Sequence, residues 1–294
     1  MIGFLDINKP EGWTSHDVVR VLKKSLNIKK IGHSGTLDPL ASGVLVIGIN
    51  EATRLFEFLN SDKIYNAKIL FGFETNTDDI TGEIIKQYNY IPSIEEIKLK
   101  LKEFTGIIKQ KPPIFSSVKI NGKRAYNLAR KNKISLNGMK EKTVEIYSIK
   151  INSYIKNELD LKIHCSTGTY IRSFARDLGN SLNTGGCLSF LKRTMANKHF
   201  SIEKSINPEL INISNLNEYL IHPAKVLEIP SFQLNKEQTK DISNGKEIKF
   251  NDNSCKIINL PAHIQLLNDT NSLIGIGLIQ DKNTIRPQKV LIHD

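Results

Sequence analysis

One carboxylate of the chain, Asp38, lies in a glycine-rich turn, GHSGTLDPLASG, that leads directly into an apolar run. Gly35 and Gly43 allow the backbone to turn tightly and allow a large group to approach it. Pro39 disfavours helical backbone angles at the residue before it. Asp38 is therefore expected on a fixed, non-helical backbone, which suits a positioned reactive carboxylate. An Asx-turn, in which the carboxylate caps its own loop, fits the same residues.

Residues outside this turn could work with such a carboxylate. A partly desolvated catalytic carboxylate needs a cation beside it, and the planar fork of Arg172, in GTYIRSFARDLG, suits that role. Tyr65 lies in an alternating strand pattern, and His33 stands shortly before the turn at Gly35. Each also has an ordinary explanation: a surface arginine at a helix start, a core tyrosine and a loop histidine. Taken singly, none of them identifies a reaction.

Hydrophobic spacing predicts the elements that must position these side chains. Thr14 and Ser15 can cap the first helix, and Ser93 can cap a later one. The irregular order of strands and helices favours an α+β fold with a central mixed, largely antiparallel sheet. The predicted strands are 1–8, 44–49, 65–73, 142–155 and 158–166, and the predicted helices are 16–26, 52–59, 93–104 and 171–182.

The texture of the sequence changes near residue 228. Beyond this point the apolar runs become short, with one short helix among them. About 65 residues are enough for a small β-rich domain. We therefore expect a large domain over residues 1–228 and a small β-rich domain over residues 229–294.

The charge balance indicates a polyanionic partner. The chain has 41 Lys and Arg against 30 Asp and Glu, for a net charge of +11. A field of this sign suits nucleic acid first and a membrane surface second, although a biased genome produces lysine-rich chains too. No apolar run reaches the roughly 18 residues of a membrane-spanning helix, and we expect no signal peptide. The 3 widely spaced cysteines fit reduced thiols of a cytosolic protein and lack metal-ligand spacing.

Several stretches together carry more information than any residue alone. They are, in order, GFLDINKPEGWTSHDVV, GHSGTLDPLASGVLVIGINEATRL, KIYNAKILFGFETNTDDITGEI, QKPPIFSSVKINGKRAYNLAR, GTYIRSFARDLG and LSFLKRT. This series resembles the blocks of the TruB family of tRNA pseudouridine synthases over nearly the whole chain. Ser34 departs from the threonine of many relatives but keeps a hydroxyl. The tail resembles the small PUA-type RNA-binding domain of bacterial members.

The resemblance implies a pseudouridine-synthase fold and an isomerase that acts on tRNA. Members of the family convert a uridine of the T-loop, at position 55 of the tRNA, to pseudouridine. The base is detached at N1, turned and rejoined through C5, with no cofactor and no metal. The resemblance also implies a cytoplasmic protein that contacts the T-arm of tRNA, and we expect a monomer.

The same resemblance assigns catalytic roles. Asp38 would be the catalytic aspartate, which attacks the sugar or the base or removes a ribose proton. Arg172 would pair with Asp38 and hold its orientation. Tyr65 would stack on the target base, which is worth roughly 1–3 kcal/mol, and would help to remove the C5 proton.

Further residues would bind the substrate. The target base must leave the T-loop stack, and His33 would fill the space that it vacates. Lys9 and the basic stretch from Lys119 to Arg124 would contact phosphates, which positions the RNA without reading its sequence. Tyr170 and Leu191 would form walls of the pocket.

Other functions remain compatible with parts of this pattern. A non-catalytic RNA-binding or tRNA-folding protein could share the scaffold, but it would be expected to lose Asp38, Tyr65 or Arg172. An rRNA-directed relative is disfavoured by the compact length. A glycosidase-like hydrolase would need two carboxylates flanking one bond. Asp78 and Asp79 are the nearest acidic candidates, and we interpret them as loop residues.

Overall fold

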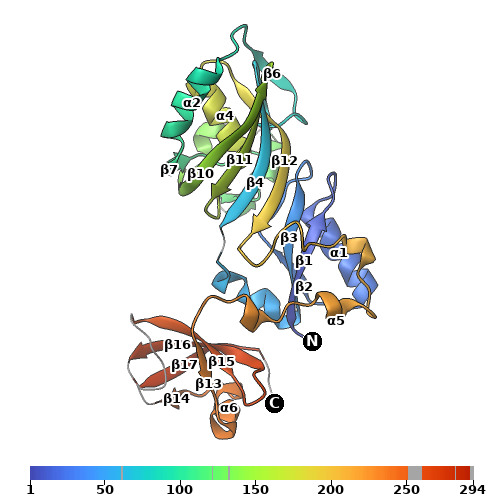
Figure 1. Cartoon of the computed structure of the whole chain (residues 1–294), viewed down its shortest axis with the longest axis vertical. Helices are drawn as coiled ribbons and strands as arrows, with labels where there is room; N and C mark the ends of the chain where they lie inside the picture. Colours follow the sequence, from blue (N-terminus) through green and yellow to red (C-terminus); the bar gives the residue numbers. More distant parts are fainter. Residues whose placement is uncertain (61, 121, 132, 251–259, 282, 292–294) are drawn as a thin grey trace.

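The computed structural model of the chain describes residues 1–60, 62–120, 122–131, 133–250, 260–281 and 283–291 (Figure 1). A large twisted sheet forms the main body, and a smaller sheet near the C-terminus forms a separate unit below it. Within the described part of the chain, no helix is long and apolar enough to cross a membrane.

The large sheet brings together segments from most of the first 196 residues. The pairing of β12 with β3 is parallel, and the other pairings across this sheet are antiparallel. The predicted mixed, largely antiparallel sheet is thus confirmed. Its strands, in spatial order, are β1 (Gly3–Lys9), β3 (Ser42–Ile49), β12 (Gly186–Ala196), β4 (Lys63–Phe71), β11 (Glu158–Cys165), β10 (Lys142–Ile155) and β7 (Gly106–Gln110), with β2 (Ile31–Ser34) added beside β3.

Alternating side chains explain why β4 lies in the middle of this sheet. Its residues Tyr65, Ala67, Ile69 and Phe71 point to one face and are buried. Helices α4 (Ile171–Ser181) and α2 (Ile94–Glu103) cover that face (Figure 1). This apolar layer is the main core, and the candidate site lies at its edge.

Capping boxes mark where the predicted helices begin. In α1 (Ser15–Leu26), the Thr14 hydroxyl accepts a hydrogen bond from the Asp17 amide, while the Asp17 carboxylate accepts one from the Thr14 amide. Ser93 does the same for α2. The helix predicted at 52–59 is instead a 3-10 helix, η1 (Asn50–Phe58), which buries Ala52 and Leu55.

A glycine permits the parallel contact between β3 and β12. Gly43 has φ +100°, and a Cβ built on it would lie 2.2 Å from the carbonyl oxygen of Arg193. Any larger residue would push the two strands apart at this point.

Shorter elements connect the sheet and carry loops toward the site. They are β5 (Phe73–Thr75), β6 (Ile84–Gln87), β8 (Lys119–Ile120), β9 (Lys123–Arg124), α3 (Ala125–Ala129), η2 (Leu136–Gly138), η3 (Pro208–Leu210), α5 (Leu216–Tyr219) and η4 (Pro223–Lys225).

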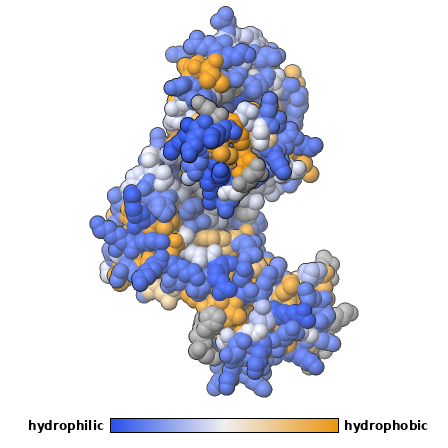
Figure 2. Space-filling view, turned by 180° about the vertical axis from the view of Figure 1, so that it is seen from behind, coloured by the Kyte–Doolittle hydropathy of each residue, from blue (hydrophilic) through white to orange (hydrophobic). Residues whose placement is uncertain are grey.

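The C-terminal segment folds into a five-stranded sheet with its own core, which confirms the predicted β-rich, PUA-like unit. The surface is indented between this unit and the upper part of the molecule (Figure 2). The strands of this C-terminal sheet, in spatial order, are β13 (Ser231–Gln233), β15 (Ala262–Leu267), β16 (Leu273–Asp281), β17 (Thr284–Val290) and β14 (Ile248–Lys249), with α6 (Lys236–Ser243) packed against them.

The C-terminal unit is also joined to the main body by packing. Leu273 and Ile276 share an apolar cluster with Phe4 and Val44. Arg54 donates a hydrogen bond to the Val290 carbonyl at 2.7 Å. The predicted boundary at residues 228 and 229 therefore separates two sheets that nonetheless pack together. The thiols Cys165 and Cys187 are free and buried, and Cys255 lies outside the described residues.

Candidate active site

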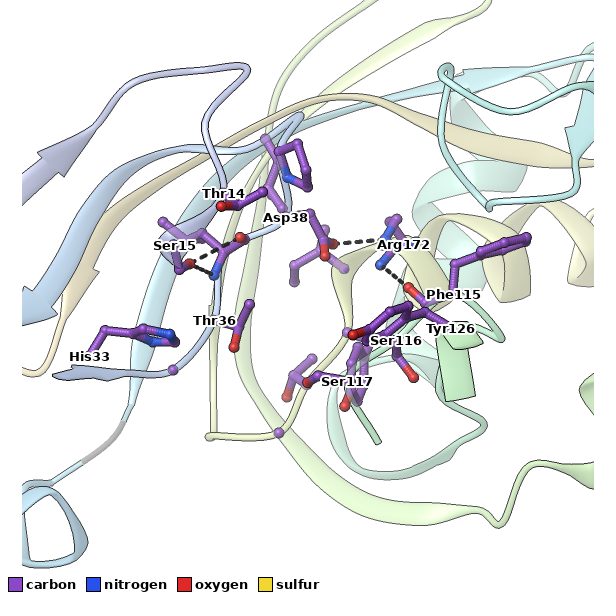
Figure 3. Close-up of a pocket in the computed structure, with 18 of the residues that line it drawn as sticks. Thr14, Ser15, His33, Thr36, Asp38, Phe115, Ser116, Ser117, Tyr126 and Arg172 are labelled. Atoms are coloured by element: carbon purple, nitrogen blue, oxygen red, sulfur yellow. Dashed lines mark hydrogen bonds and ion pairs between the residues drawn. The ribbon is translucent and has the colours of Figure 1, made fainter. Parts of the chain in front are cut away.

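Asp38 and Arg172 meet across the body of the molecule, although they are 134 positions apart in the chain. The Nε of Arg172 donates a hydrogen bond to Oδ2 of Asp38 at 2.8 Å (Figure 3). The Arg172 side chain is only 6% exposed, whereas that of Asp38 is 39% exposed. The carboxylate therefore remains open on one side, while its cationic partner is enclosed by protein.

The turn that carries Asp38 is fixed from below by α1. The Ser15 hydroxyl accepts a hydrogen bond from the Leu37 amide at 2.9 Å and donates one to the Leu37 carbonyl at 3.1 Å (Figure 3). The Pro39 carbonyl accepts a bond from the Gly12 amide. Thr14 is thus the helix cap, and Ser15, which was also predicted as a cap, anchors the loop instead.

Arg172 is anchored in turn by backbone carbonyls from separate segments. Its Nη1 donates to Thr77 at 3.0 Å, and its Nη2 donates to Phe115 at 3.0 Å. Together with the bond to Asp38, these contacts hold each nitrogen of the guanidinium. The fork can adopt one orientation only, and Asp38 inherits that orientation.

The acidic loop 76–82 lies behind this pair. Asp78 forms an ion pair with Arg176 at 2.8 Å, one helical turn from Arg172, and Asp79 lies 3.6 Å from Nη1 of Arg172. Burial raises the pKa of Asp78 to about 6, and Arg176 opposes this shift. The interpretation of Asp78 and Asp79 as plain loop residues is therefore incomplete.

The second carboxylate does not create a hydrolase geometry. Oδ1 of Asp79 accepts hydrogen bonds from the Thr77 and Thr81 hydroxyls, and its side chain is 7% exposed. Asp79 does not line the cavity that Asp38 faces. The two carboxylates thus flank a guanidinium instead of a substrate bond, which argues against the glycosidase-like alternative.

Asp38 faces a cavity of about 730 Å³ between the turn on one side and the 115–126 segment on the other (Figure 3). Most predicted site residues contribute to its walls. The lining comprises residues 14–16, 33, 35–39, 63, 65, 115–117, 124, 126, 167–172 and 191.

Tyr65 and Leu191 line this cavity from neighbouring strands β4 and β12, and each is 6% exposed. Burial raises the pKa of the Tyr65 phenol, while nearby Arg193 acts in the opposite direction. The phenol is therefore neutral at neutral pH. These two side chains form an apolar wall suited to an aromatic ring.

His33 and Tyr170 also line this cavity. Burial, followed by the charge of Arg193, lowers the pKa of His33, so its ring is neutral at neutral pH. Nδ1 of His33 has no hydrogen-bond partner among the described residues. The backbone of Tyr170 is held by the Gln110 side chain, which accepts from its amide at 2.8 Å and donates to its carbonyl at 3.0 Å. Burial raises the pKa of the Tyr170 phenol.

The predicted phosphate-binding residues divide into different groups. Arg124 lines the cavity and donates a hydrogen bond to the Ser117 carbonyl at 2.6 Å. Lys119 is exposed on the same hairpin but does not line the cavity. The structure contradicts the prediction for Lys9, whose side chain is 0% exposed and whose ammonium donates to the carbonyls of Pro10 and Trp13. Lys9 closes its own turn and does not face an RNA backbone.

Some residues of the site were not singled out from the sequence. Lys63, Thr167 and Thr36 line the cavity, and Arg193 is buried beside it. Lys63 and Arg193 reach the site through the pairing of β4 with β12, whereas Thr36 and Thr167 lie in the loops that lead to Asp38 and Arg172. Among the residues that the structure describes, no group of three or more His, Cys, Asp or Glu side chains is arranged to hold a metal ion.

The chain matches known sequences over both of its sheets. The model of the TruB family pseudouridylate synthase N-terminal domain matches residues 23–171, and that of the pseudouridine synthase II TruB C-terminal domain matches residues 230–291. A tRNA pseudouridine synthase B of Microcystis aeruginosa (strain NIES-843 / IAM M-2473) is 40% identical, covering 99% of each chain. One from Alkaliphilus oremlandii (strain OhILAs) is 43% identical, covering 85% of this chain and 84% of the relative.

Solved structures share the fold. A chain of a Cbf5-Nop10-Gar1 complex superposes with a TM-score of 0.73 at 24% identity, covering 99% of this chain and 85% of that one. A chain of an H/ACA RNP bound to a substrate RNA containing 2′-deoxyuridine superposes with a TM-score of 0.71 at 21% identity and the same coverage. With both domain models matched and relatives near 40% identity over its full length, the chain belongs to the TruB family of pseudouridine synthases.

Proposed function

We propose that this pseudouridine synthase converts a uridine of the tRNA T-loop, at position 55, to pseudouridine, with Asp38 as the catalytic group. The observation that carries the proposal is the half-open carboxylate, held by a buried and fully anchored arginine, at the wall of a cavity of about 730 Å³. Small-molecule sites commonly enclose about 300–1,000 Å³, so one nucleoside fits.

The target base must enter this cavity from a folded loop. Extrusion of the base costs a few kcal/mol of free energy, and stacking of the base on Tyr65 would offset roughly 1–3 kcal/mol of that cost. His33, neutral and lacking a partner at Nδ1, would fill the space left in the T-loop. Leu191 and Tyr170 would enclose the base and exclude water.

The reaction rearranges bonds without loss of atoms. The C1′–N1 bond breaks, the base turns, and C1′ joins C5; the C5 proton then leaves, and N1 gains a proton. Asp38 would start this sequence by attack on carbon or by removal of a ribose proton, and either role needs an oriented carboxylate. Arg172 would supply that orientation, and Tyr65 would help to remove the C5 proton at the end, giving up its own phenolic proton to solvent as it does so.

The rest of the chain would grip the RNA. Arg124 and Lys119 project from the 116–125 hairpin region and would contact phosphates, and the domain over residues 229–294 would extend the contact. The net charge of +11 supports such binding. We also propose that the protein acts as a monomer in the cytoplasm, since one chain supplies every group named here.

A non-catalytic RNA-folding protein is the second candidate from the sequence. The assembled Asp38–Arg172 pair argues against it, because binding alone does not need a carboxylate facing an anionic ligand.

Incubation with a T-arm transcript tests the proposal. Mapping of pseudouridine should show conversion of one uridine, in the T-loop. The same stem with its loop uridine replaced by cytidine is the control and should stay unmodified. Binding without any conversion would favour the RNA-folding alternative.

A further inference from the structure

Two cations that form no salt bridge with another described residue lie side by side at the edge of the cavity. A Cβ built on Gly35 would lie 3.1 Å from Nζ of Lys63 and 3.6 Å from Nη1 of Arg193. Gly35 has φ +70°, a conformation that favours glycine, so no side chain fills the space between the two cations. A cluster of positive charge therefore borders open space beside the catalytic turn.

Lys63 reaches this space from the strand that carries Tyr65. The two residues are two positions apart on β4, so their side chains share one face and their Cα atoms are about 7 Å apart. Among the described residues, the Lys63 ammonium forms one hydrogen bond, a long one of 3.4 Å to the Thr167 hydroxyl. The neighbouring carboxylate of Asp62 pairs instead with His164. Burial, followed by the charge of Arg193, lowers the pKa of Lys63 to about 8.

Arg193 lies next to Lys63 and is buried. Its side chain is 0% exposed, its Nε donates to the Val44 carbonyl at 2.6 Å, and its Nη2 donates to the Gly35 carbonyl at 3.1 Å. Its Nη1 has no hydrogen-bond partner within the described residues. A buried cation with an unpaired donor is costly, and a bound anion relieves that cost.

We infer that Lys63, with Arg193 behind it, binds the phosphate that flanks the flipped nucleotide. This inference rests on the proposed function, which places the target base on Tyr65. One ribose separates a base from its own phosphates, so a base on Tyr65 brings a phosphate near the adjacent side chain on the same strand face. The charge-assisted bond forms when the nucleotide is extruded, and it therefore stabilises the flipped state.

The experiment combines protein and RNA changes in one cycle. Lys63→Met removes the charge with little change in length. T-arm RNAs carrying one neutral methylphosphonate linkage, directly 5′ or directly 3′ of the target uridine, remove one phosphate charge. Equilibrium binding is measured for each pair of protein and RNA. Lys162→Met is the control, because Lys162 is an exposed lysine on the solvent face of neighbouring β11 and does not line the cavity.

With the wild-type protein, one of the two modified linkages should weaken binding about tenfold. Lys63→Met should bind the native RNA about tenfold more weakly and show no further loss with that linkage. Its log–log salt slope should be shallower by about 0.7–0.9. Lys162→Met should keep the full sensitivity to the linkage. If Lys63→Met loses as much further affinity with each modified linkage as the wild-type protein does, the two effects are independent. That result would overturn the inference and assign Lys63 a structural role.

A second variant guards against loss of folding. Lys63→Arg keeps the charge and should recover most of the binding and the sensitivity to the linkage. If Lys63→Met is unfolded and Lys63→Arg is insensitive to both linkages, the inference is also overturned. Failure of the wild-type protein to form pseudouridine on the native RNA would instead contradict the proposed function, since the binding cycle does not require turnover.

Discussion

At the scale of single residues, the site depends on an ion pair with one exposed partner and one buried partner. Asp38 is open to the cavity, while Arg172 behind it is enclosed and holds it through Nε. The guanidinium of Arg172 also donates through Nη1 and Nη2 to the Thr77 and Phe115 carbonyls. These bonds keep it from turning away from Asp38. Arg172 therefore fixes the orientation of the carboxylate, and the exposure of Asp38 leaves that carboxylate accessible from the cavity.

Tyr65→Phe tests the proposed use of the phenol. The ring is kept, so binding and flipping of the base should be near wild type, whereas formation of pseudouridine should fall at least a hundredfold because nothing accepts the C5 proton. Binding and single-turnover rate would be measured on the same T-arm RNA. Turnover at the wild-type rate would show that the phenol takes no part in proton transfer.

Asp6, outside the site, should make stability depend on pH. Burial raises its pKa to about 7, while Oδ2 accepts one bond from the Ser201 amide and Oδ1 has no partner among the residues described. The folded state therefore binds this proton more tightly than the unfolded chain. Stability is present at low pH and is lost as pH rises from about 4 to 7, by at most about 4 kcal/mol.

Asp6→Asn removes this titration. Denaturant unfolding at pH 5 and pH 8 should show the variant gaining stability relative to wild type as pH rises. Comparison of the two proteins cancels the other groups that titrate in this range, Asp78 included. If the free energy of unfolding changes equally with pH in both proteins, the assignment to Asp6 is contradicted.

At the scale of elements, α1 supports the catalytic turn through one hydroxyl. Ser15→Ala removes both bonds to Leu37 and leaves buried backbone groups unpaired, which costs about 1–3 kcal/mol. Some of that loss should appear as disorder of the turn, so kcat should fall about tenfold while the melting temperature falls only moderately. Ser25→Ala, on the same helix but away from the cavity, is the matched control. Equal kcat for both variants would show that Ser15 only stabilises the helix.

The sequence predicted elements better than it predicted contacts between them. Caps at Thr14 and Ser93 and the alternation of β4 are local, so they are readable from neighbouring residues. A 3-10 helix at 50–58 shares its early apolar spacing with an α-helix and was missed. The burial of Lys9 depends on tertiary packing around its turn, and the KPEG pattern alone suggested an exposed loop.

The candidate site shows the same division. Asp38, Tyr65, Arg172, His33, Tyr170, Leu191 and Arg124, which were singled out from the sequence, all line one cavity. Lys63 and Arg193 could not be placed beforehand, because the register of β12 against β4 brings Arg193 opposite Tyr65. The contact of Asp78 with Arg176 likewise requires the loop and the helix to be packed together.

At the scale of the whole molecule, the C-terminal unit covers part of the main body, and we propose that it also extends the RNA-binding surface. Deletion of residues 229–294 would uncover Phe4, Val44 and Val46, which pack against Leu273 and Ile276. The truncated chain should therefore melt at a lower temperature than the full chain.

Below that melting temperature, the truncated chain should bind tRNA more weakly, with a salt slope shallower by roughly one unit for each phosphate that is no longer bound. Its single-turnover rate at saturating RNA should stay within about tenfold of the full chain, because the proposed catalytic residues precede the deletion. An unchanged salt slope, or a collapsed rate in a folded protein, would show that the unit is not a separable binding module.

Release of the C5 hydrogen tests the central claim most directly, because that bond must break if C5 replaces N1 at the sugar. A T-arm RNA tritiated at C5 of its uridines is incubated with the wild-type protein and with Asp38→Asn, which keeps size but loses charge. The wild-type protein should release the tritium of the single T-loop uridine, while Asp38→Asn should bind the RNA and release none. Release by Asp38→Asn at a rate near wild type would contradict the account.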